Sequence, residues 1–349
     1  MRKIKWGVIG SGGIARRRTI PEGILPASNA RLTSVYGPTA ATNAEVAREF
    51  GAEPARSIEA LLESDVEAVY IGSPPGKHLE QVQACARAGK HVLCEKPLGI
   101  TVSEVSAMIR ACRSASVRFG TAFMMRFHSR HREALRLIQE GRLGQPVFAR
   151  AQLSCWYPPI PGAWRQQPAE SGGGSLIDMG GHCIDLLEMY FGKIKAVSCL
   201  INRTVHAYAS EDAAVATLLF ENGAMGVVDS FFCIPDDASR NVLELYGTHG
   251  SIIASGTIGQ EADGEMIARL DDLPDLPGYD SLQERKAGIP IPINPAPVNT
   301  YLAEIEEFSR AILEDRDPVN NAALGLRSQE VLSACYESAH LRRQVTLGA

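Results

Sequence analysis

The chain has 349 residues, of which 45% are hydrophobic and 21% charged, and its formal net charge at pH 7 is -5. This composition indicates a folded globular protein with room for two domains and argues against a disordered chain. The negative net charge provides no basic field for nucleic acid or an anionic membrane surface, and no run of about 18 apolar residues indicates a membrane span.

The cysteines and the N-terminal residues indicate in which cellular compartment the protein resides. The eight cysteines are scattered and form no Cys-x-x-Cys pair, so the sequence indicates neither a zinc site nor a disulfide framework. The apolar run near the N-terminus covers only residues 6–9 and ends in glycine, which is too short for the core of a signal peptide. We therefore expect a cytoplasmic protein without a bound metal.

The first predicted strand, Ile4 to Ile9, is followed at once by a glycine-rich turn. Gly10-Ser-Gly-Gly-Ile-Ala15 is a Gly-x-Gly-x-x-Ala form of the dinucleotide fingerprint, whose glycines permit a tight turn and bring a pyrophosphate onto the next helix N-terminus. Its position between a strand and a helical segment supports dinucleotide binding. Arginines 16–18 follow, and we expect at least one of them to reach a cofactor phosphate.

The second predicted strand, 31–36, ends without the acidic residue that usually holds the ribose 2′-hydroxyl of NAD. Gly37, Pro38 and Thr39 stand there instead, so no negative charge would repel a 2′-phosphate, although no arginine stands beside them in the sequence to attract one. This departure predicts that NADP is accepted and weakly preferred.

Strand and helix patterns alternate as far as residue 122, which predicts a doubly wound parallel sheet. Ligands bind at the carboxyl ends of the strands in such sheets, where Ser73, Glu95 and Lys96 would emerge beside the glycine turn. The expected helices are one with a Thr42-x-x-Glu45 capping box that ends near Gly51, a short one from Ser57, one over 78–88 and one that opens at Thr101-x-x-Glu104; the expected strands are 68–71, 91–94 and 117–122.

Beyond Phe123 the pattern changes to long strand-like runs, which predict one large antiparallel sheet. Glu221-Asn-Gly223 predicts a hairpin with a type I′ turn, and residues 271–298 are Pro-rich and irregular. We place the domain boundary after residue 122, with a dinucleotide-binding domain over 1–122 and a substrate-binding and oligomerisation domain over 123–349. The expected elements are a helix over 128–140, strands at 147–156, 194–202, 213–220, 224–232, 242–246 and 251–254, and helices over 298–314 and 322–342.

The stretch 171–191 combines three glycines with a helical pattern that carries ionisable residues. Residues four apart share a helix face, so Asp178 and His182 would project together, with Asp185 further along the same side. A carboxylate beside an imidazole can perform acid/base chemistry, and the same spacing also suits a buried structural pair. The glycine pair 180–181 lowers helix stability by about 1 kcal/mol per residue relative to alanine, which suggests a close approach to the backbone there.

Together these motifs resemble the Gfo/Idh/MocA family of nicotinamide-dependent oxidoreductases, which includes many sugar dehydrogenases. The resemblance implies an α/β chain: an N-terminal Rossmann domain with a doubly wound parallel sheet, then an α+β domain with a large, predominantly antiparallel open sheet that forms homodimers or homotetramers. It also implies hydride transfer between NAD(P) and a secondary hydroxyl or ketone of a sugar, polyol, cyclitol or sugar derivative, without a metal. The motifs that carry it are the glycine turn, Glu95-Lys96-Pro97, Trp164-Arg165, the glycines 172–174 and Asp178-x-x-x-His182.

Matched by motif, the resemblance implies that Lys96 is the catalytic lysine and that Asp178 and His182 are its substrate-side partners. We expect His182 to be the principal base, Lys96 to polarise the substrate oxygen and Asp178 to orient both, and the first two roles are open to exchange. The predicted cofactor contacts are Gly10, Ser11, Gly12, Gly13, Ile14, Ala15, Thr39, Ser73, Pro74, His78, Glu95, Lys96, Arg126, Trp164 and Arg165.

Two alternatives remain at this point. The scaffold also hosts glycosidases that retain NAD for transient oxidation and elimination, and net turnover of free NAD(P)H with a simple sugar would argue against that chemistry. A non-enzymatic dinucleotide sensor is the other alternative, and the intact Lys-Pro and Asp-x-x-x-His motifs disfavour it. The loops that would read the substrate, 158–167 and 271–298, carry no pattern that selects one sugar.

Overall fold

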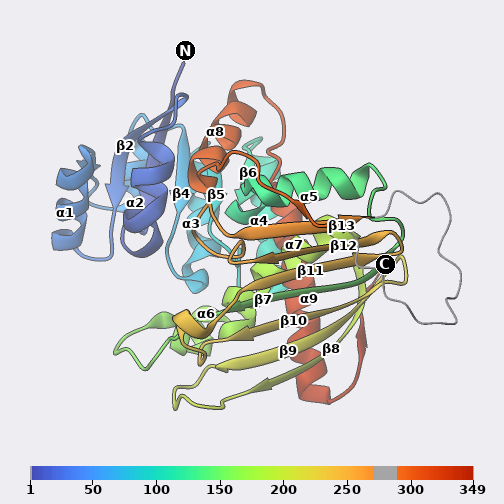
Figure 1. The fold of residues 1–349 in the computed structure, drawn as a ribbon. Helices are drawn as coiled ribbons and strands as arrows, with labels where there is room; N and C mark the ends of the chain where they lie inside the picture. The colour runs from blue at the N-terminus through green and yellow to red at the C-terminus, as the bar shows by residue number, and fades with distance from the viewer. Residues whose placement is uncertain (1, 271–288, 349) are drawn as a thin grey trace, which may run out of the picture.

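The computed structural model describes residues 2–270 and 289–348, so most of the Pro-rich segment predicted to be irregular lies outside the described residues. Two sheets lie side by side, and the C-terminal helices pack against both halves of the molecule (Figure 1). Within the described residues, none of the helices combines the length and apolarity needed to cross a membrane.

The first sheet is parallel throughout, which confirms the predicted doubly wound α/β architecture. Its central strand β4 is buried along its whole length, as expected when helices cover both faces of a sheet. The six strands, in spatial order, are β3 (Glu53–Pro54), β2 (Ala30–Tyr36), β1 (Ile4–Ile9), β4 (Ala68–Ile71), β5 (His91–Cys94) and β6 (Phe119–Thr121).

The helices of this half begin close to the predicted positions, with one correction at a cap. Helix α1 begins at Ala40, because the Thr39 side chain caps it by accepting the Thr42 N–H at 3.1 Å. The capping box predicted at Thr42 is therefore wrong, whereas both arms of the box at Thr101 are present. The helices are α1 (Ala40–Phe50), α2 (Ile58–Glu63), α3 (His78–Arg87) and α4 (Val102–Ser114).

The helix after the glycine turn, Ala15–Ile24, is a π-helix. Pro21 lies inside it and has no N–H to donate, and the Leu25 N–H reaches back five residues to the Ile20 carbonyl. A hydrogen bond over five residues, in place of the four of an α-helix, makes each turn of this helix wider.

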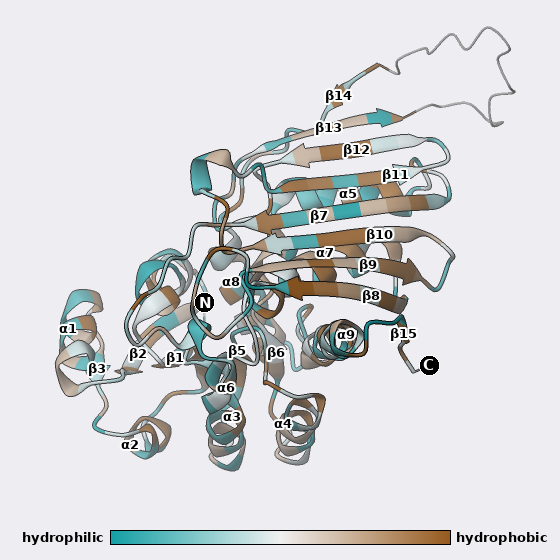
Figure 2. Cartoon of the chain, turned by 90° about the horizontal axis from the view of Figure 1, so that it is seen from below, coloured by the Kyte–Doolittle hydropathy of each residue, from teal (hydrophilic) through white to brown (hydrophobic). Residues whose placement is uncertain are grey.

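The second sheet has nine strands within the described residues and is antiparallel except where β10 pairs with β7, which agrees with the predicted predominantly antiparallel sheet. Helices α5 (Ser129–Gln139), α7 (Gly181–Phe191) and α9 (Ala322–Leu341) lie on one face (Figure 1), and strands β8 to β10 are rich in apolar residues (Figure 2). The strands, in spatial order, are β14 (Ile291–Pro292), β13 (Glu265–Leu270), β12 (Gly250–Ser255), β11 (Val242–Gly247), β7 (Pro146–Ser154), β10 (Met225–Phe231), β9 (Ala213–Phe220), β8 (Ile194–Asn202) and β15 (Val345–Thr346).

The hairpin between β9 and β10 forms as predicted, but its turn is of another type. The Gly223 N–H donates to the Phe220 carbonyl, so Glu221 and Asn222 are the central residues of the turn. A type I′ turn needs positive φ at both central residues, and neither has it, whereas Gly223 has φ of 90°. The glycine therefore closes the hairpin after the turn instead of forming its centre.

The C-terminal helix α8 (Thr300–Leu313) packs on the first sheet rather than the second. Its Phe308 ring lies 5.6 Å from that of Trp6, and the Trp6 indole N–H donates to Ser309 at 3.0 Å. Ile305 joins the same apolar core. The C-terminal part of the chain thus completes the core of the N-terminal half.

Candidate active site

The predicted helix over residues 171–191 forms in two parts, a π-helical turn over Leu176–Gly180 and then α7. The close approach expected at the glycine pair 180–181 is present at Gly180, where a Cβ would lie 2.9 Å from Leu176 Cδ1, and a tighter one lies earlier in the chain. A Cβ at Gly174 would lie 1.9 Å from a backbone carbonyl oxygen of Glu211, whereas one at Gly181 would meet nothing nearer than 3.5 Å. Glycine is therefore required where the chain enters the helix, and this close contact fixes the position of the π-helical turn.

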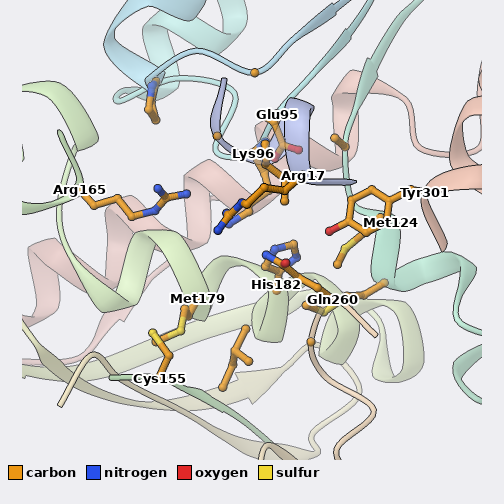
Figure 3. Close-up of a pocket in the computed structure, with 18 of the residues that line it drawn as sticks. Arg17, Glu95, Lys96, Met124, Cys155, Arg165, Met179, His182, Gln260 and Tyr301 are labelled. Atoms are coloured by element: carbon orange, nitrogen blue, oxygen red, sulfur yellow. Dashed lines mark hydrogen bonds between the residues drawn. The ribbon is translucent and has the colours of Figure 1, made fainter. Parts of the chain in front are cut away.

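A cavity of about 360 Å³ lies between the carboxyl ends of the parallel strands and the N-terminal end of α7 (Figure 3). Arg165 reaches toward Lys96 and Arg17 from one side, Tyr301 and Gln260 lie on the other, and His182 lies between them. The predicted residues that line the cavity are Gly13, Ile14, Ser73, Glu95, Lys96, Trp164, Arg165 and His182. Lining residues that sequence reasoning missed include Met124, Met125, Cys155, Met179, Asp236, Asn241, Gln260 and Tyr301.

Two cations share one carboxylate beside this cavity, and we name Lys96, Asp178 and Arg165 the Asp178 cluster. The Lys96 ammonium donates to the Asp178 carbonyl oxygen at 2.7 Å and to Oδ1 at 3.0 Å. Arg165 Nε donates to Oδ2 at 3.0 Å, and its guanidinium lies 4.2 Å from the centre of the Trp164 ring. Burial alone would raise the pKa of Asp178, but the Arg165 and Lys96 charges outweigh burial and hold that pKa well below its usual range. Asp178 is therefore a permanent carboxylate that fixes the Lys96 ammonium.

His182 reaches the cavity as a buried, neutral imidazole with only 8% of its surface exposed. Burial, and then the nearby Lys96 charge, lower the pKa of His182 well below its usual value, against the opposing effect of Asp178. Its Nδ1 has no hydrogen-bond partner among the described residues. Asp178 thus contacts Lys96, but among the described residues it makes no hydrogen bond to His182.

The glycine turn shows two different uses of glycine. Gly10 has φ of 80°, and a Cβ there would lie 2.5 Å from the Ser73 backbone nitrogen, so this glycine allows the turn to pack on the next strand end. A Cβ at Gly12 would meet nothing within 4 Å. Ser11 is buried beside the turn, and Ala15 begins the π-helix within the core. Gly12 therefore leaves open space of the kind that a pyrophosphate requires.

Of the three arginines after this turn, Arg17 lines the cavity. Arg16 is occupied by ion pairs with Glu45 and Glu49 on α1. Arg18 pairs with glutamates as well, one of them Glu261 in the second half of the chain. Arg17 is accordingly the arginine of this group that lies in position to meet a phosphate.

Eight predicted cofactor contacts do not line the cavity, namely Gly10, Ser11, Gly12 and Ala15 at the glycine turn, Thr39, Pro74, His78 and Arg126. His78 is fully buried, and its ring contacts the Ser73 carbonyl at 2.8 Å and the Pro97 carbonyl at 3.1 Å, so it ties two strand-end loops together. Pro74 follows Ser73 in the loop after β4 and is not a lining residue. Arg126 lines a separate cavity. His78 therefore supports the wall of the site without facing its interior, whereas Arg126 lies away from it.

Arg126 and Asp185 form a buried pair away from the candidate site. Arg126 Nε donates to both carboxylate oxygens of Asp185 at 2.9 and 2.8 Å, and both residues line the second cavity. Asp185 therefore does not share the face of Asp178 and His182, contrary to expectation. The π-helical turn changes the angular spacing between Asp178 and α7. Within α7, Asp185 pairs with Arg126 at the second cavity, whereas His182 lines the candidate site.

Thr39 lies at another cavity of about 270 Å³, which is also lined by Gly37 and Arg56. No arginine stands beside Thr39 in the sequence, but the fold brings Arg56, which follows β3, to the same cavity. A two-residue strand leaves no pattern that would have predicted this approach.

Comparison with known proteins agrees with this architecture. Residues 4–123 match the model of an oxidoreductase family with an NAD-binding Rossmann fold, and residues 131–253 match that of the GFO/IDH/MocA C-terminal domain. The chain is 30% identical to 1,5-anhydro-D-fructose reductase of Ensifer adhaerens, over 88% of each chain. It is 29% identical to D-xylose 1-dehydrogenase (NADP(+)) 2 of Haloferax volcanii, over 98% of this chain and 99% of the other.

A solved structure shows the same fold over nearly the whole length. The aldose-aldose oxidoreductase of Caulobacter crescentus, crystallised with glycerol, superposes with a TM-score of 0.88 at 26% identity and covers 99% of this chain and 100% of its own. The agreement extends over both sheets, so the relation concerns the complete two-part architecture.

Proposed function

The chain belongs to the Gfo/Idh/MocA family of NAD-binding oxidoreductases, and from this premise we propose that it oxidises or reduces a sugar-like substrate in the cavity beside Lys96 and His182. One observation carries the proposal: the strand ends of the NAD-binding half and α7 of the other half line a single cavity. A lysine from one half and a histidine from the other therefore meet where a substrate hydroxyl can be held. The names of the two similar curated proteins point to sugars as the substrate class.

NAD(P), when bound, would accept or supply the hydride, and side chains of the protein would transfer the proton. Lys96, fixed by Asp178, donates a hydrogen bond to the substrate oxygen and favours its developing negative charge. His182 is neutral and takes the hydroxyl proton during alcohol oxidation; the protonated ring returns it during carbonyl reduction. An exchange of these two roles would leave the same groups in contact with the same oxygen.

The cavity at Thr39 is our candidate for the part of the protein that distinguishes NADP from NAD. We propose a preference for NADP, because Arg56 supplies a positive charge where a 2′-phosphate would lie and the usual acidic residue is absent. Arg56→Ala should weaken NADPH binding more than NADH binding, and Thr39→Asp should shift the preference toward NAD. Arg48→Ala is a matched control, since Arg48 is exposed on α1 and does not line this cavity. Equal losses for both cofactors in the Arg56 variant would refute this assignment.

The substrate class is tested with the compounds that the similar proteins are named for. Purified protein is assayed with 1,5-anhydro-D-fructose and either NADPH or NADH, and with D-xylose and either NADP⁺ or NAD⁺, by following absorbance of the reduced cofactor. Net turnover, abolished by Lys96→Met, is the expected result. Release of an aglycone from glycosides without net cofactor turnover would favour the retained-NAD glycosidase instead, and tight cofactor binding without either reaction would favour a sensor.

The face of the second sheet opposite α5, α7 and α9 is proposed to bind a second copy of the chain. Leu200 and Val215 lie directly opposite each other on β8 and β9 with 75% and 38% of their surface exposed. Met225, with 59% exposed, lies beside Phe148 on the same face. Rows of apolar side chains across a sheet are typical of an oligomer interface, and Leu200→Glu with Met225→Glu should convert a dimer or tetramer to monomers in light scattering. A wild-type chain that is monomeric at high concentration would refute it.

We also propose that the protein resides in the cytoplasm. All eight cysteines are free thiols, six of them buried, as suits a reducing compartment. Cell fractionation of the host with an antibody against the chain tests this, and recovery in an oxidising compartment would contradict it.

A further inference from the structure

A chain of polar side chains runs through the core beneath the cavity, from Thr19 through Tyr70 to Glu95. The Thr19 hydroxyl donates to the Tyr70 oxygen at 3.0 Å, and the Tyr70 hydroxyl donates to Glu95 Oε1 at 2.5 Å. Thr19 and Tyr70 are fully buried, whereas Glu95 is half-buried and lines the cavity. A polar group in the core is costly unless it is hydrogen-bonded, and a phenylalanine on β4 would pack there without this requirement. Two buried hydroxyl groups therefore hold one carboxyl group at the cavity wall.

The charges beside Glu95 do not cancel. In the Asp178 cluster, two cations face one carboxylate, which leaves a net charge of +1 next to the cavity. An oxidised nicotinamide ring carries a further positive charge, whereas the reduced ring is neutral. Without another anion, the oxidised ring would enter a region that is already positive. Two acidic side chains line the cavity, and of these Glu95 is half-buried whereas Asp236 is exposed.

We infer that the Glu95 carboxylate is the counter-charge of the oxidised nicotinamide ring, and that Tyr70 is a positioning residue that holds it at the cavity wall. The inference rests on the proposed function, because hydride transfer beside Lys96 and His182 requires the ring to enter this cavity. Binding of the oxidised cofactor then favours the ionised carboxyl group, whose proton goes to solvent, and binding of the reduced cofactor does not. Glu95 thereby strengthens binding of NAD(P)⁺ relative to NAD(P)H.

The surroundings of Glu95 suit a group that changes its charge. Burial raises the pKa of Glu95, and the Lys96 charge, the hydrogen bond from Tyr70 and the Arg165 charge oppose this effect. The net shift is upward, so a part of the population takes up a proton nearer to neutral pH than an exposed glutamate would. A cation that enters the cavity lowers this pKa again and releases the proton.

The other ionisable groups around Glu95 do not replace it. Burial raises the pKa of Glu304 on α8 and of the Cys94 thiol well above their usual values, which favours their uncharged forms. Burial also keeps Tyr301 protonated by raising its pKa. Arg17 and Asp236 line the same cavity, but both are exposed, so water and salt screen their charges.

The test is a set of binding measurements that needs no sugar. Wild-type protein and Glu95→Gln are titrated with NADP⁺ and NADPH, and in parallel with NAD⁺ and NADH, by fluorescence. The ratio of the Kd of the oxidised form to that of the reduced form should rise by about tenfold or more in the variant, through weaker binding of the oxidised form. In weakly buffered solution, NADP⁺ should release protons from the wild type and fewer from Glu95→Gln, whereas NADPH should release few from either.

Two further variants separate charge from structure. Tyr70→Phe keeps the acid but removes its hydrogen-bond donor, so the pKa of Glu95 should rise and the pH at which NADP⁺ affinity declines should move upward. Glu304→Gln is the matched control, since Glu304 is a buried acid of the neighbouring helix that does not line the cavity. It should leave the oxidised-to-reduced ratio unchanged.

An unchanged ratio and unchanged proton release in a folded Glu95→Gln protein would overturn the inference. Should that variant fail to fold, Tyr70→Phe decides alone, and an unshifted pH dependence of NADP⁺ binding would overturn it. Cofactor binding without turnover of any sugar would refute the proposed substrate class and leave this test intact.

Discussion

Replacement of Asp178 by asparagine should both destabilise the protein and impair catalysis. The side chain accepts hydrogen bonds from Lys96 and Arg165 at 3.0 Å each, and Lys96 and Asp178 expose only 12% and 16% of their side chains. Removal of one partner from a buried ion pair costs about 3 to 5 kcal/mol, because the remaining charge stays buried without compensation. Arg165 exposes a third of its side chain and can gain water, so we expect the low end, about 3 kcal/mol in the free energy of unfolding.

The pH dependence of this loss has a definite sign. The folded pKa of Asp178 lies below its unfolded value of about 4, so the stabilisation is present above that value and disappears as the pH falls toward the folded pKa. The difference in urea-unfolding free energy between wild type and Asp178→Asn should therefore be full at neutral pH and shrink in acid. With its ammonium no longer fixed, Lys96 should support a kcat lower by about a hundredfold or more.

The matched control is Asp315→Asn, which removes a carboxylate that also contacts an arginine but is 94% exposed. It should leave stability and kcat unchanged. Unfolding is followed by both fluorescence and circular dichroism without cofactor, since coincident transitions are needed for a free energy to be defined in a chain of this size. An Asp178→Asn protein as stable as wild type at neutral pH would refute the assignment of Asp178 as the buried counter-ion.

Three further results are expected. Lys96→Met and His182→Ala should each lower kcat by at least about a hundredfold, and their effects should combine less than additively in a double-mutant cycle, because both serve one proton transfer. Gly174→Ala should lower the thermal unfolding midpoint, since its methyl group would lie 1.9 Å from a carbonyl oxygen, whereas Gly12→Ala should retain that midpoint and weaken NADPH binding in titrations. Burial lowers the pKa of His131 to about 3, below an unfolded value of about 6.5, so stability should fall by at most about 1.4 kcal/mol per pH unit as the pH decreases between these values, and His131→Gln should flatten that dependence in urea unfolding.

Elements that local patterns determine were predicted well. The first strand, the buried strands β4 and β5 and the capping box at Thr101 each have their signal within a few neighbouring residues. Strands β3, β14 and β15 have two residues each and exist through pairing with a neighbour, so the sequence offers no periodicity for them. The choice between Thr39 and Thr42 as a cap depends on the extended backbone at Thr39, which composition does not reveal.

The residues of the candidate site also divide into those that a local motif predicts and those that it does not. Lys96, Asp178 and His182 were found from motifs, since each follows a strand end or enters a helix with a distinct glycine pattern. Tyr301 and Gln260 reach the cavity from parts of the chain far from those motifs, and nothing local marks them. Their approach depends on how α8 and the loop after β12 pack, and that information is distributed over the whole core.

The packing of α8 also explains why the chain cannot be understood as two independent halves. One wall of the cavity includes Tyr301 of α8, and α8 is held by Ile305 and Phe308 within the apolar core around Trp6. The apolar contacts that stabilise α8 also place its first turn at the cavity, so the position of the cavity wall depends on the burial of this helix. Substitutions at Phe308, far from any reacting atom, would move the wall as well as weaken the core.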